Sequence, residues 1–358
     1  MRVLYELVAT PSVSGSERAA AEVFVRHAAR LGMRAEVDEA GNALAHRGPV
    51  DAETHVVLLG HIDTVPGEIA VRIEDDVLHG RGSVDAKGPL AAMLLAGARA
   101  ELPCGVRVTV AGAVGEETAG SPGARHLAKL YRPAACIIGE PSGWDGVTLG
   151  YKGRLLVTAS ATRQSTHSAG PEPTACDDMH AWWSAVRAHA EMFNKGRDRV
   201  FDQLQASIRQ TISEADGLRQ HAKMHVGFRL PRELTPVELM QAVRSLTPEH
   251  VTLDFSGEET AFATNRNDAV ARALSSAIRA HNGRPRPKLK TGTSDMNVVA
   301  PHWRCPIAAY GPGDSALDHT PHERLDLDEF ARATRVLECT ISQLASELTA
   351  AAPAHAAR

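Results

Sequence analysis

The sequence predicts an α/β protein that carries a second, inserted module, and three observations support this prediction. Continuous apolar runs of strand length occupy residues 55–60, 106–114 and 135–139. A helix-like stretch at 89–102 separates the first two runs, and this alternation is typical of a sheet covered on both faces. From about Tyr151 the pattern changes in character, which indicates a separate structural unit.

The inserted module is predicted from strand-like and helix-like stretches in the middle of the chain. Its expected strands and helices are 154–160, 176–193, 223–230, 236–245 and 251–255. A helix is expected at 268–281, and its sequence pattern resembles that of the first part of the chain. We therefore expect a discontinuous first domain formed by residues 1–150 and 261–358, with an inserted domain at 151–260.

Composition excludes several classes of protein. The chain has 358 residues, a formal net charge of -4 at pH 7 and 43% hydrophobic residues. This balance gives no reason to expect a nucleic-acid or membrane partner. The five cysteines are widely spaced and include no C-x-x-C pair, so we expect reduced thiols rather than a disulfide framework. No signal peptide or membrane span is recognisable, and we expect a cytoplasmic protein.

Acids and a histidine follow the predicted strands at the points where those strands end. His61 follows the first apolar run, Glu116 and Glu117 follow the second, and Glu140 follows the third. Ligands of open α/β sheets bind outside the carboxyl ends of the strands, so these side chains are expected to converge. A further acid, Asp85, lies in a glycine-rich turn before a helix. Any one of these acids alone is more simply explained as a helix cap or a solvated turn.

The combination of imidazole and carboxylates without thiolates suits zinc, cobalt or manganese. Asp85 is a candidate bridge between two such ions. Asp63, two residues after His61, is expected to accept the second ring N–H of that histidine and fix its tautomer. Because Glu116 and Glu117 are adjacent, they point in different directions, so one can bind metal while the other acts as a general base.

These residues lie in segments that resemble the M20 metallopeptidases and deacylases over nearly the whole chain. The matching segments are Gly60-His-Ile-Asp-Thr-Val-Pro66, Gly80-Arg-Gly-Ser-Val-Asp-Ala-Lys-Gly88, Gly115-Glu-Glu-Thr118, Gly139-Glu-Pro141, Gly292-Thr-Ser-Asp295 and His319-Thr-Pro-His-Glu323. The resemblance implies a mixed-sheet, zinc-peptidase-like catalytic domain with an inserted α+β lid of ferredoxin-like type at 151–260.

The resemblance also implies the roles of the candidate ligands. Two divalent ions per subunit are expected, with Zn²⁺ preferred over Co²⁺ or Mn²⁺. One ion is assigned to His61, Asp85 and Glu140, and the other to Asp85, Glu117 and His319. Glu116 is the expected catalytic base, and the peptide bond after Asp85 is expected to be cis. The chain departs from the family at His322, where asparagine is usual, and we favour His319 over His322 as the ligand.

In the lid, the resemblance points to further site residues. His167 is expected to polarise the scissile carbonyl, and Arg229 is expected to hold a substrate carboxylate. Gly292, Thr293 and Ser294 are expected to contact substrate. Lids of this family often pair two subunits, so a homodimer is expected.

Within the family, the chain is most similar to hydrolases that release lysine or ornithine from the terminal glutamate side chain of an acidic amino-group carrier protein. Segments 150–153 and 290–297 carry this likeness, which implies a role in lysine or arginine biosynthesis. Basic clusters at 195–199 and 284–290 either steer the acidic carrier toward the protein or are ordinary solvated loops. Alternatives are an acetylornithine deacetylase, a succinyl-diaminopimelate desuccinylase, a carboxypeptidase, or an inactive module that only binds metal or carrier.

Overall fold

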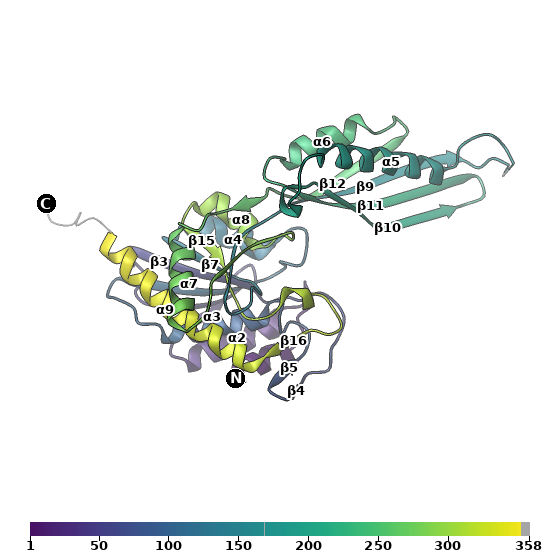
Figure 1. Cartoon of the computed structure of the whole chain (residues 1–358). Coiled ribbons are helices and arrows are strands. Elements are labelled where there is room, and N and C mark those ends of the chain that lie inside the picture. Colours follow the sequence, from purple (N-terminus) through teal and green to yellow (C-terminus); the bar gives the residue numbers. More distant parts are fainter. Residues whose placement is uncertain (168, 352–358) are drawn as a thin grey trace. The chain divides into compact units, whose positions relative to one another are not determined.

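The computed structural model describes residues 1–167 and 169–351. Ser168 of the expected inserted domain and residues 352–358 of the expected first domain lie outside the described residues. The chain divides into two compact units (Figure 1). Unit 1 comprises residues 1–150, 264–289 and the chain from 294 onward, and unit 2 comprises residues 151–263 and 290–293. Among the described residues, no helix has the length and apolar character needed to cross a membrane.

Unit 1 is built around a mixed sheet. In spatial order its strands are β1 (Arg34–Val37), β2 (Ala43–Arg47), β6 (Val106–Ala113), β3 (Thr54–His61), β7 (Ala135–Gly139), β15 (Ile307–Ala309) and β8 (Gly146–Tyr151), with β14 (Arg286–Lys290) beside β8. Neighbours among β6, β3, β7 and β15 are parallel, whereas β1, β2 and β8 pair antiparallel. This arrangement confirms the predicted α/β class with a mixed sheet.

Helices cover the parallel strands because those strands are apolar on both faces. Every residue of β3 except His55 is buried. The helices of unit 1 are α1 (Arg2–Ala9), α2 (Arg18–Arg30), α3 (Lys87–Arg99), α4 (Pro122–Leu130), α7 (Ala269–Ala280), α8 (Asp295–Trp303) and α9 (Leu327–Ala351). Helix α3 packs against both β3 and α9, and its residues Lys87–Gly97 are all buried. The result is one continuous hydrophobic core in unit 1.

A small second sheet in unit 1 lies close in sequence to several candidate site residues. Its order is β16 (Arg324–Asp326), β5 (Val77–His79) and β4 (Arg72–Glu74), all antiparallel. Pairing of Arg324 with His79 brings the segment that ends at Glu323 beside the glycine-rich turn that begins at Gly80. The sheet therefore holds the segment that ends at Glu323 next to the turn that begins at Gly80, although the two are far apart in sequence.

Unit 2 has the element order of the ferredoxin-like βαββαβ arrangement. Its main elements are β9 (Gly153–Gln164), α5 (Ala175–Phe193), β10 (Gln205–Ala215), β11 (Arg219–Leu230), α6 (Pro236–Ser245) and β12 (Val251–Glu259). The antiparallel sheet has the order β10-β11-β9-β12, and α5 and α6 pack on it. Alternating burial along β9 shows that only one face of this sheet is covered by helices. Short elements are a 3-10 turn at Val200–Asp202 and β13 (Phe262–Ala263).

Candidate metal centre

Three neighbouring parallel strands bring the predicted side chains to one edge of the sheet. His61 ends β3, Glu116 and Glu117 follow β6, and Glu140 follows β7. In the strand register His61 lies opposite Ala113 of β6, and the residue before it lies opposite Gly139 of β7. The convergence expected from the strand ends is therefore present in the structure.

Three overlapping groups of donor atoms lie within 4.8 Å of one another, and each group has the composition of a metal site. The groups are His61 with Glu116 and Glu117, His61 with Asp85 and Glu140, and Asp85 with Glu117 and His319. The second and third groups coincide with the two ligand sets expected from the sequence. Asp85 is their shared member.

Asp85 faces a different histidine with each of its carboxylate oxygens. Oδ1 lies 3.2 Å from Nε2 of His61, and Oδ2 lies 3.0 Å from Nε2 of His319. Burial opposes ionisation, but hydrogen bonds from His319 and His61 outweigh it and lower the pKa of Asp85. The Asp85–Ala86 peptide bond is cis, as the resemblance implies. A carboxylate placed in this way has the geometry of a bridge between two ions.

His61 is buried and held at both ring nitrogens. Its Nδ1 lies 3.0 Å from the backbone oxygen of Asp63 and 3.4 Å from Oδ1 of the same residue. The expected partner is therefore correct, but the closer atom is the carbonyl oxygen rather than the carboxylate. Burial lowers the pKa of His61, whereas hydrogen bonds with Asp63 and Asp85 raise it, and the balance is a pKa well above the usual value.

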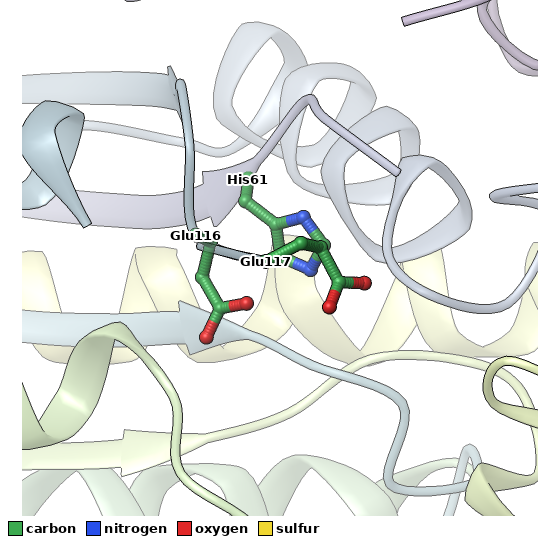
Figure 2. Close-up of side chains that lie close together, drawn as sticks. All are labelled: His61, Glu116 and Glu117. Carbon is green, nitrogen blue, oxygen red and sulfur yellow. The ribbon is translucent and has the colours of Figure 1, made fainter. Parts of the chain in front are cut away.

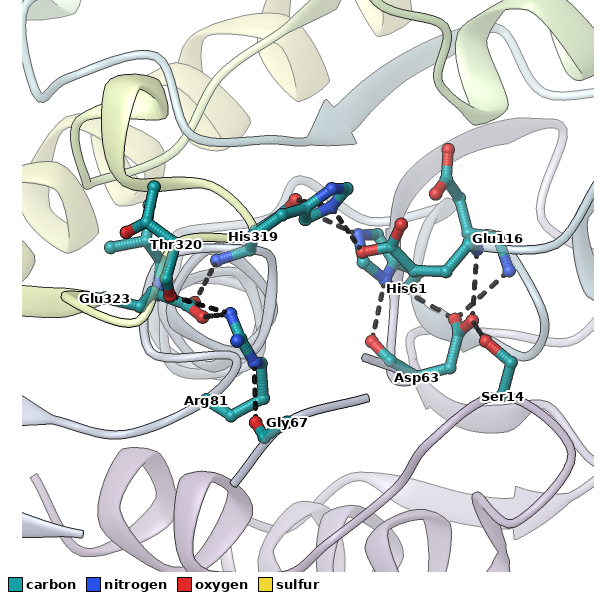
Figure 3. A network of polar contacts seen from close by, with 12 residues as sticks. Ser14, His61, Asp63, Gly67, Arg81, Glu116, His319, Thr320 and Glu323 are labelled. Carbon is teal, nitrogen blue, oxygen red and sulfur yellow. Dashed lines mark hydrogen bonds and ion pairs between the residues drawn. The ribbon is translucent and has the colours of Figure 1, made fainter. Parts of the chain in front are cut away.

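The Asp63 carboxylate organises the turn that carries the two adjacent glutamates (Figure 3). Its Oδ1 accepts the backbone N–H of Glu116 at 3.1 Å, and its Oδ2 accepts that of Glu117 at 3.1 Å. Ser14 donates its hydroxyl to Oδ2 at 2.7 Å. Asp63 thus fixes the backbone from which both glutamate side chains project, in addition to contacting the ring of His61.

Glu116 and Glu117 point in different directions from this turn (Figure 2). The Oε1 atom of Glu117 lies 2.9 Å from Nε2 of His319, so this carboxylate is directed at the histidine. Burial raises the pKa of Glu116 well above its usual value. One glutamate therefore belongs with the donor group around His319, while the other adds a second carboxylate beside His61.

His319 lies in the left-handed region with φ 61°, although it is not glycine. Hydrogen bonds with Asp85 and Glu117 raise its pKa to about 10, against the opposing effect of burial. His322, the alternative ligand considered from the sequence, is exposed and belongs to none of the three donor groups. The geometry therefore favours His319.

The donor set fits a pair of divalent cations. His61 and His319 each direct Nε2 at carboxylate oxygens 2.9 to 3.2 Å away. The carboxylates therefore face imidazole nitrogens that carry a proton when no metal ion is bound. Release of these protons would expose two imidazole nitrogens and several carboxylate oxygens to the same ions. Imidazole and carboxylate ligands without thiolate are typical of hydrolytic Zn²⁺, Co²⁺ and Mn²⁺ sites.

Three residues at this site had no role in the sequence prediction. They are Ser14, which contacts Asp63, and the ion pair Arg81–Glu323. No signal identifies Ser14, because it lies 49 positions from its partner. Glu323 lies within the segment that begins at His319, and an acid four residues after a candidate ligand is the signal that the sequence offers.

The remaining predicted residues lie in unit 2 or at its boundary. Arg229 donates to Oγ1 of Thr293 at 2.9 Å. Ser294 accepts from Met296 N–H at 3.2 Å and caps α8. His167 is exposed, and its Nδ1 accepts the N–H of Ala169 at 3.2 Å. A Cβ added at Gly292 would meet no heavy atom within 4 Å.

Comparison with known proteins gives a consistent result. Residues 57–343 match the model of peptidase family M20/M25/M40. A LysW-lysine hydrolase of Deinococcus radiodurans is 45% identical over 349 residues, which cover 96% of each chain. A putative LysW-lysine/LysW-ornithine hydrolase of Thermococcus kodakarensis is 39% identical over 345 residues, covering 95% of this chain and 91% of that protein.

Among solved structures, an M20 family metallo-carboxypeptidase of Sulfolobus solfataricus superposes with a TM-score of 0.78 at 17% identity. The match covers 96% of this chain and 99% of the other. The YXEP protein of Bacillus subtilis, described as a dinuclear metal-binding peptidase of the M20 family, gives a TM-score of 0.68 at 12% identity. That match covers 96% and 97% of the two chains. At these identities the likeness concerns the fold.

Proposed function

This chain belongs to peptidase family M20/M25/M40, and we propose that it hydrolyses the amide bond that joins lysine to the carrier protein LysW. The bond runs from the α-amine of lysine to the side-chain carboxyl of the carrier's terminal glutamate. The observation that carries the proposal is the 45% identity to a LysW-lysine hydrolase over 96% of both chains. Ornithine is the second candidate leaving group, because the 39% identical relative is named for both amino acids.

We assign the two candidate ligand groups to a pair of cations, most simply Zn²⁺. His61, Asp85 and Glu140 would hold one ion, and Asp85, Glu117 and His319 would hold the other. Bound ions of this kind supply a Lewis acid for the carbonyl oxygen and lower the pKa of water to about 7. Asp63 holds the ring of His61 and the turn of Glu116 and Glu117 in place, which keeps these side chains fixed during turnover.

Glu116 is the proposed general base. Its carboxylate lies with His61 and Glu117 in one group but projects away from Glu117, so it is available for proton transfer. In the proposed reaction Glu116 accepts the proton of the attacking water and then delivers it to the departing α-amine. The products are free lysine and the regenerated glutamate side chain of the carrier.

We propose that unit 2 supplies the substrate contacts. The guanidinium of Arg229 donates to the hydroxyl of Thr293, which orients it. The planar guanidinium is the proposed partner of the free carboxylate of the lysyl group. His167 is the proposed donor to the oxyanion, and Gly292 leaves space for substrate backbone.

Pairing of two subunits through unit 2 is also part of the proposal. Strand β10 is an edge strand of its sheet, and most of its residues are exposed, with Ile208 42% exposed. An open edge of this kind is a ready surface for a second chain. We place the reaction in the cytoplasm, where the five free cysteines would remain reduced.

A parallel substrate assay tests the proposed function. Metal-loaded enzyme is offered lysine-charged carrier, ornithine-charged carrier, acetylornithine, succinyl-diaminopimelate and dipeptides, and kcat/KM is measured for each. We expect the lysine-charged carrier to give the highest value. Preference for a free acylated amino acid or a dipeptide would overturn the substrate assignment while leaving the metal centre in place.

A further inference from the structure

The carboxylate of Glu323 is buried beside the backbone that leads into Asp85. The residue is only 1% exposed. One of its oxygens accepts the N–H groups of both Val84 and Asp85, at 2.9 and 3.0 Å. The other oxygen lies 2.8 Å from the guanidinium of Arg81. Hydrogen bonds from backbone N–H to an ionised carboxylate are stronger than neutral ones, so Glu323 restrains the position of Asp85.

Arg81 adds a second contact with the segment that carries Glu323 and a contact with one further segment. The same guanidinium nitrogen that meets Glu323 donates to the carbonyl of Thr320 at 3.2 Å, and Nε donates to the carbonyl of Gly67 at 3.0 Å (Figure 3). Thr320 directly follows His319. The ion pair therefore ties the segment of Asp85 to the segment of His319, which are otherwise separated by more than half of the chain.

His319 needs such a restraint. Its backbone has φ 61°, a conformation that residues with a Cβ adopt at a cost. Its imidazole must also stay within reach of both Asp85 and Glu117, which approach it from two different loops. A loop with these demands keeps its geometry only where the surrounding contacts determine it.

We propose that Glu323 and Arg81 are positioning residues that set the separation of Asp85 and His319 and thereby the affinity of the protein for its metal ions. Neither residue is assigned as a metal ligand. Both act through the backbone of the ligand-bearing segments. The inference rests on the ligand assignment proposed above, and the experiment below distinguishes failure of one from failure of the other.

The test measures metal affinity directly. Metal-free protein is titrated with Zn²⁺ against a chromophoric chelator for the wild type, Glu323→Gln, Arg81→Lys and Asp85→Asn. In Glu323→Gln the amide oxygen still accepts N–H groups, but the charge is lost and an NH2 group faces Arg81. We expect affinity to fall by about 10- to 100-fold. Arg81→Lys keeps the charge beside Glu323 but loses the planar fork, so a smaller loss is expected.

A matched control separates positioning from general stability. The Arg163–Asp178 pair in unit 2 is also a partly buried guanidinium–carboxylate pair, with two contacts of 2.5 and 2.9 Å. Asp178→Asn should lower the melting temperature of the metal-free protein and leave Zn²⁺ affinity within twofold of wild type. For Glu323→Gln, activity should also recover as free Zn²⁺ is raised, which a purely structural defect would not produce.

The variants separate the positioning role of Glu323 and Arg81 from the ligand role of Asp85. If Asp85→Asn loses metal while Glu323→Gln and Arg81→Lys bind Zn²⁺ like wild type, the positioning role is wrong and the ligand set stands. If Asp85→Asn itself binds both ions normally, the ligand set is wrong and the inference fails with it. If metal-free Glu323→Gln does not fold, Arg81→Lys decides the question by the same criterion.

Discussion

Nε2 of His319 lies 2.9 Å from Oε1 of Glu117, although 202 positions of sequence separate the two residues. The same nitrogen lies 3.0 Å from Oδ2 of Asp85. This contact joins the C-terminal part of unit 1 to the turn after β6, and it completes a donor group that no single sequence segment contains.

Glu116→Gln should abolish turnover without loss of metal. Glutamine has nearly the same shape but cannot accept the proton of water, so kcat should fall at least about 100-fold. Metal content, measured by elemental analysis, should equal that of wild type. Glu39→Gln is the control, since the Glu39 side chain is 84% exposed and should be replaceable without effect. Substantial turnover by Glu116→Gln would reject its role as the base.

Asp63→Asn should impair both catalysis and metal binding. The two carboxylate oxygens accept from Ser14 and from the N–H groups of Glu116 and Glu117. In asparagine one of these oxygens is replaced by an NH2 group, which donates and cannot accept. We expect kcat and Zn²⁺ affinity each to fall about 10- to 100-fold. Ser14→Ala removes only one donor and should cost less. Equal effects of the two variants would show that the turn is not held by the charge of Asp63.

Arg229→Lys should raise KM for charged carrier and leave metal content unchanged. A lysine ammonium lacks the planar fork that matches a carboxylate, so we expect an increase of about tenfold, equivalent to ~1.4 kcal/mol. Arg232→Lys, an exposed arginine nearby in sequence, provides the control. A rise in KM that is equally large for a substrate amide lacking the free carboxylate would contradict the assigned contact.

Stability should fall as pH is lowered from 6.5 toward 4, because of two histidines outside the metal centre. Burial, followed by the charge of Arg107, lowers the pKa of both His46 and His55 to about 4. At these two residues the unfolded chain therefore binds more protons than the folded chain between pH 4 and 6.5. By linkage each histidine costs on the order of 3 kcal/mol across this window.

Denaturant unfolding at several pH values measures this effect. The double variant His46→Gln/His55→Gln cannot take up these protons, so its stability should change less than that of wild type over the same range. Comparison of the two proteins cancels the titration of the metal ligands, which they share. Parallel pH profiles would show that the two histidines do not carry the dependence.

The sequence predicted the parts of this molecule that depend on local pattern. The strands before His61, Glu116 and Glu140 were recognisable because they are continuous apolar runs, and the general rule for strand ends then placed their side chains together. Strand β10 was missed because it is an edge strand with mostly exposed residues, and so lacks the apolar alternation that marks a half-buried strand.

The role of Asp63 illustrates what local pattern cannot supply. Its position two residues after His61 identified it as a partner of that histidine, and the contact is present. Its second task, accepting the N–H groups of Glu116 and Glu117, depends on the packing of β3 beside β6. The contacts of Arg81 with Glu323 likewise arise from the pairing of β16 with β5, for which a single sequence gives no register.

Anomalous diffraction from crystals of the Zn²⁺-loaded protein locates the metal ions independently of activity. We expect two zinc peaks on either side of the Asp85 carboxylate, one within coordination distance of His61 and Glu140 and the other within coordination distance of Glu117 and His319. Zinc peaks that appear only elsewhere in the protein, with none at Asp85, would contradict this ligand assignment.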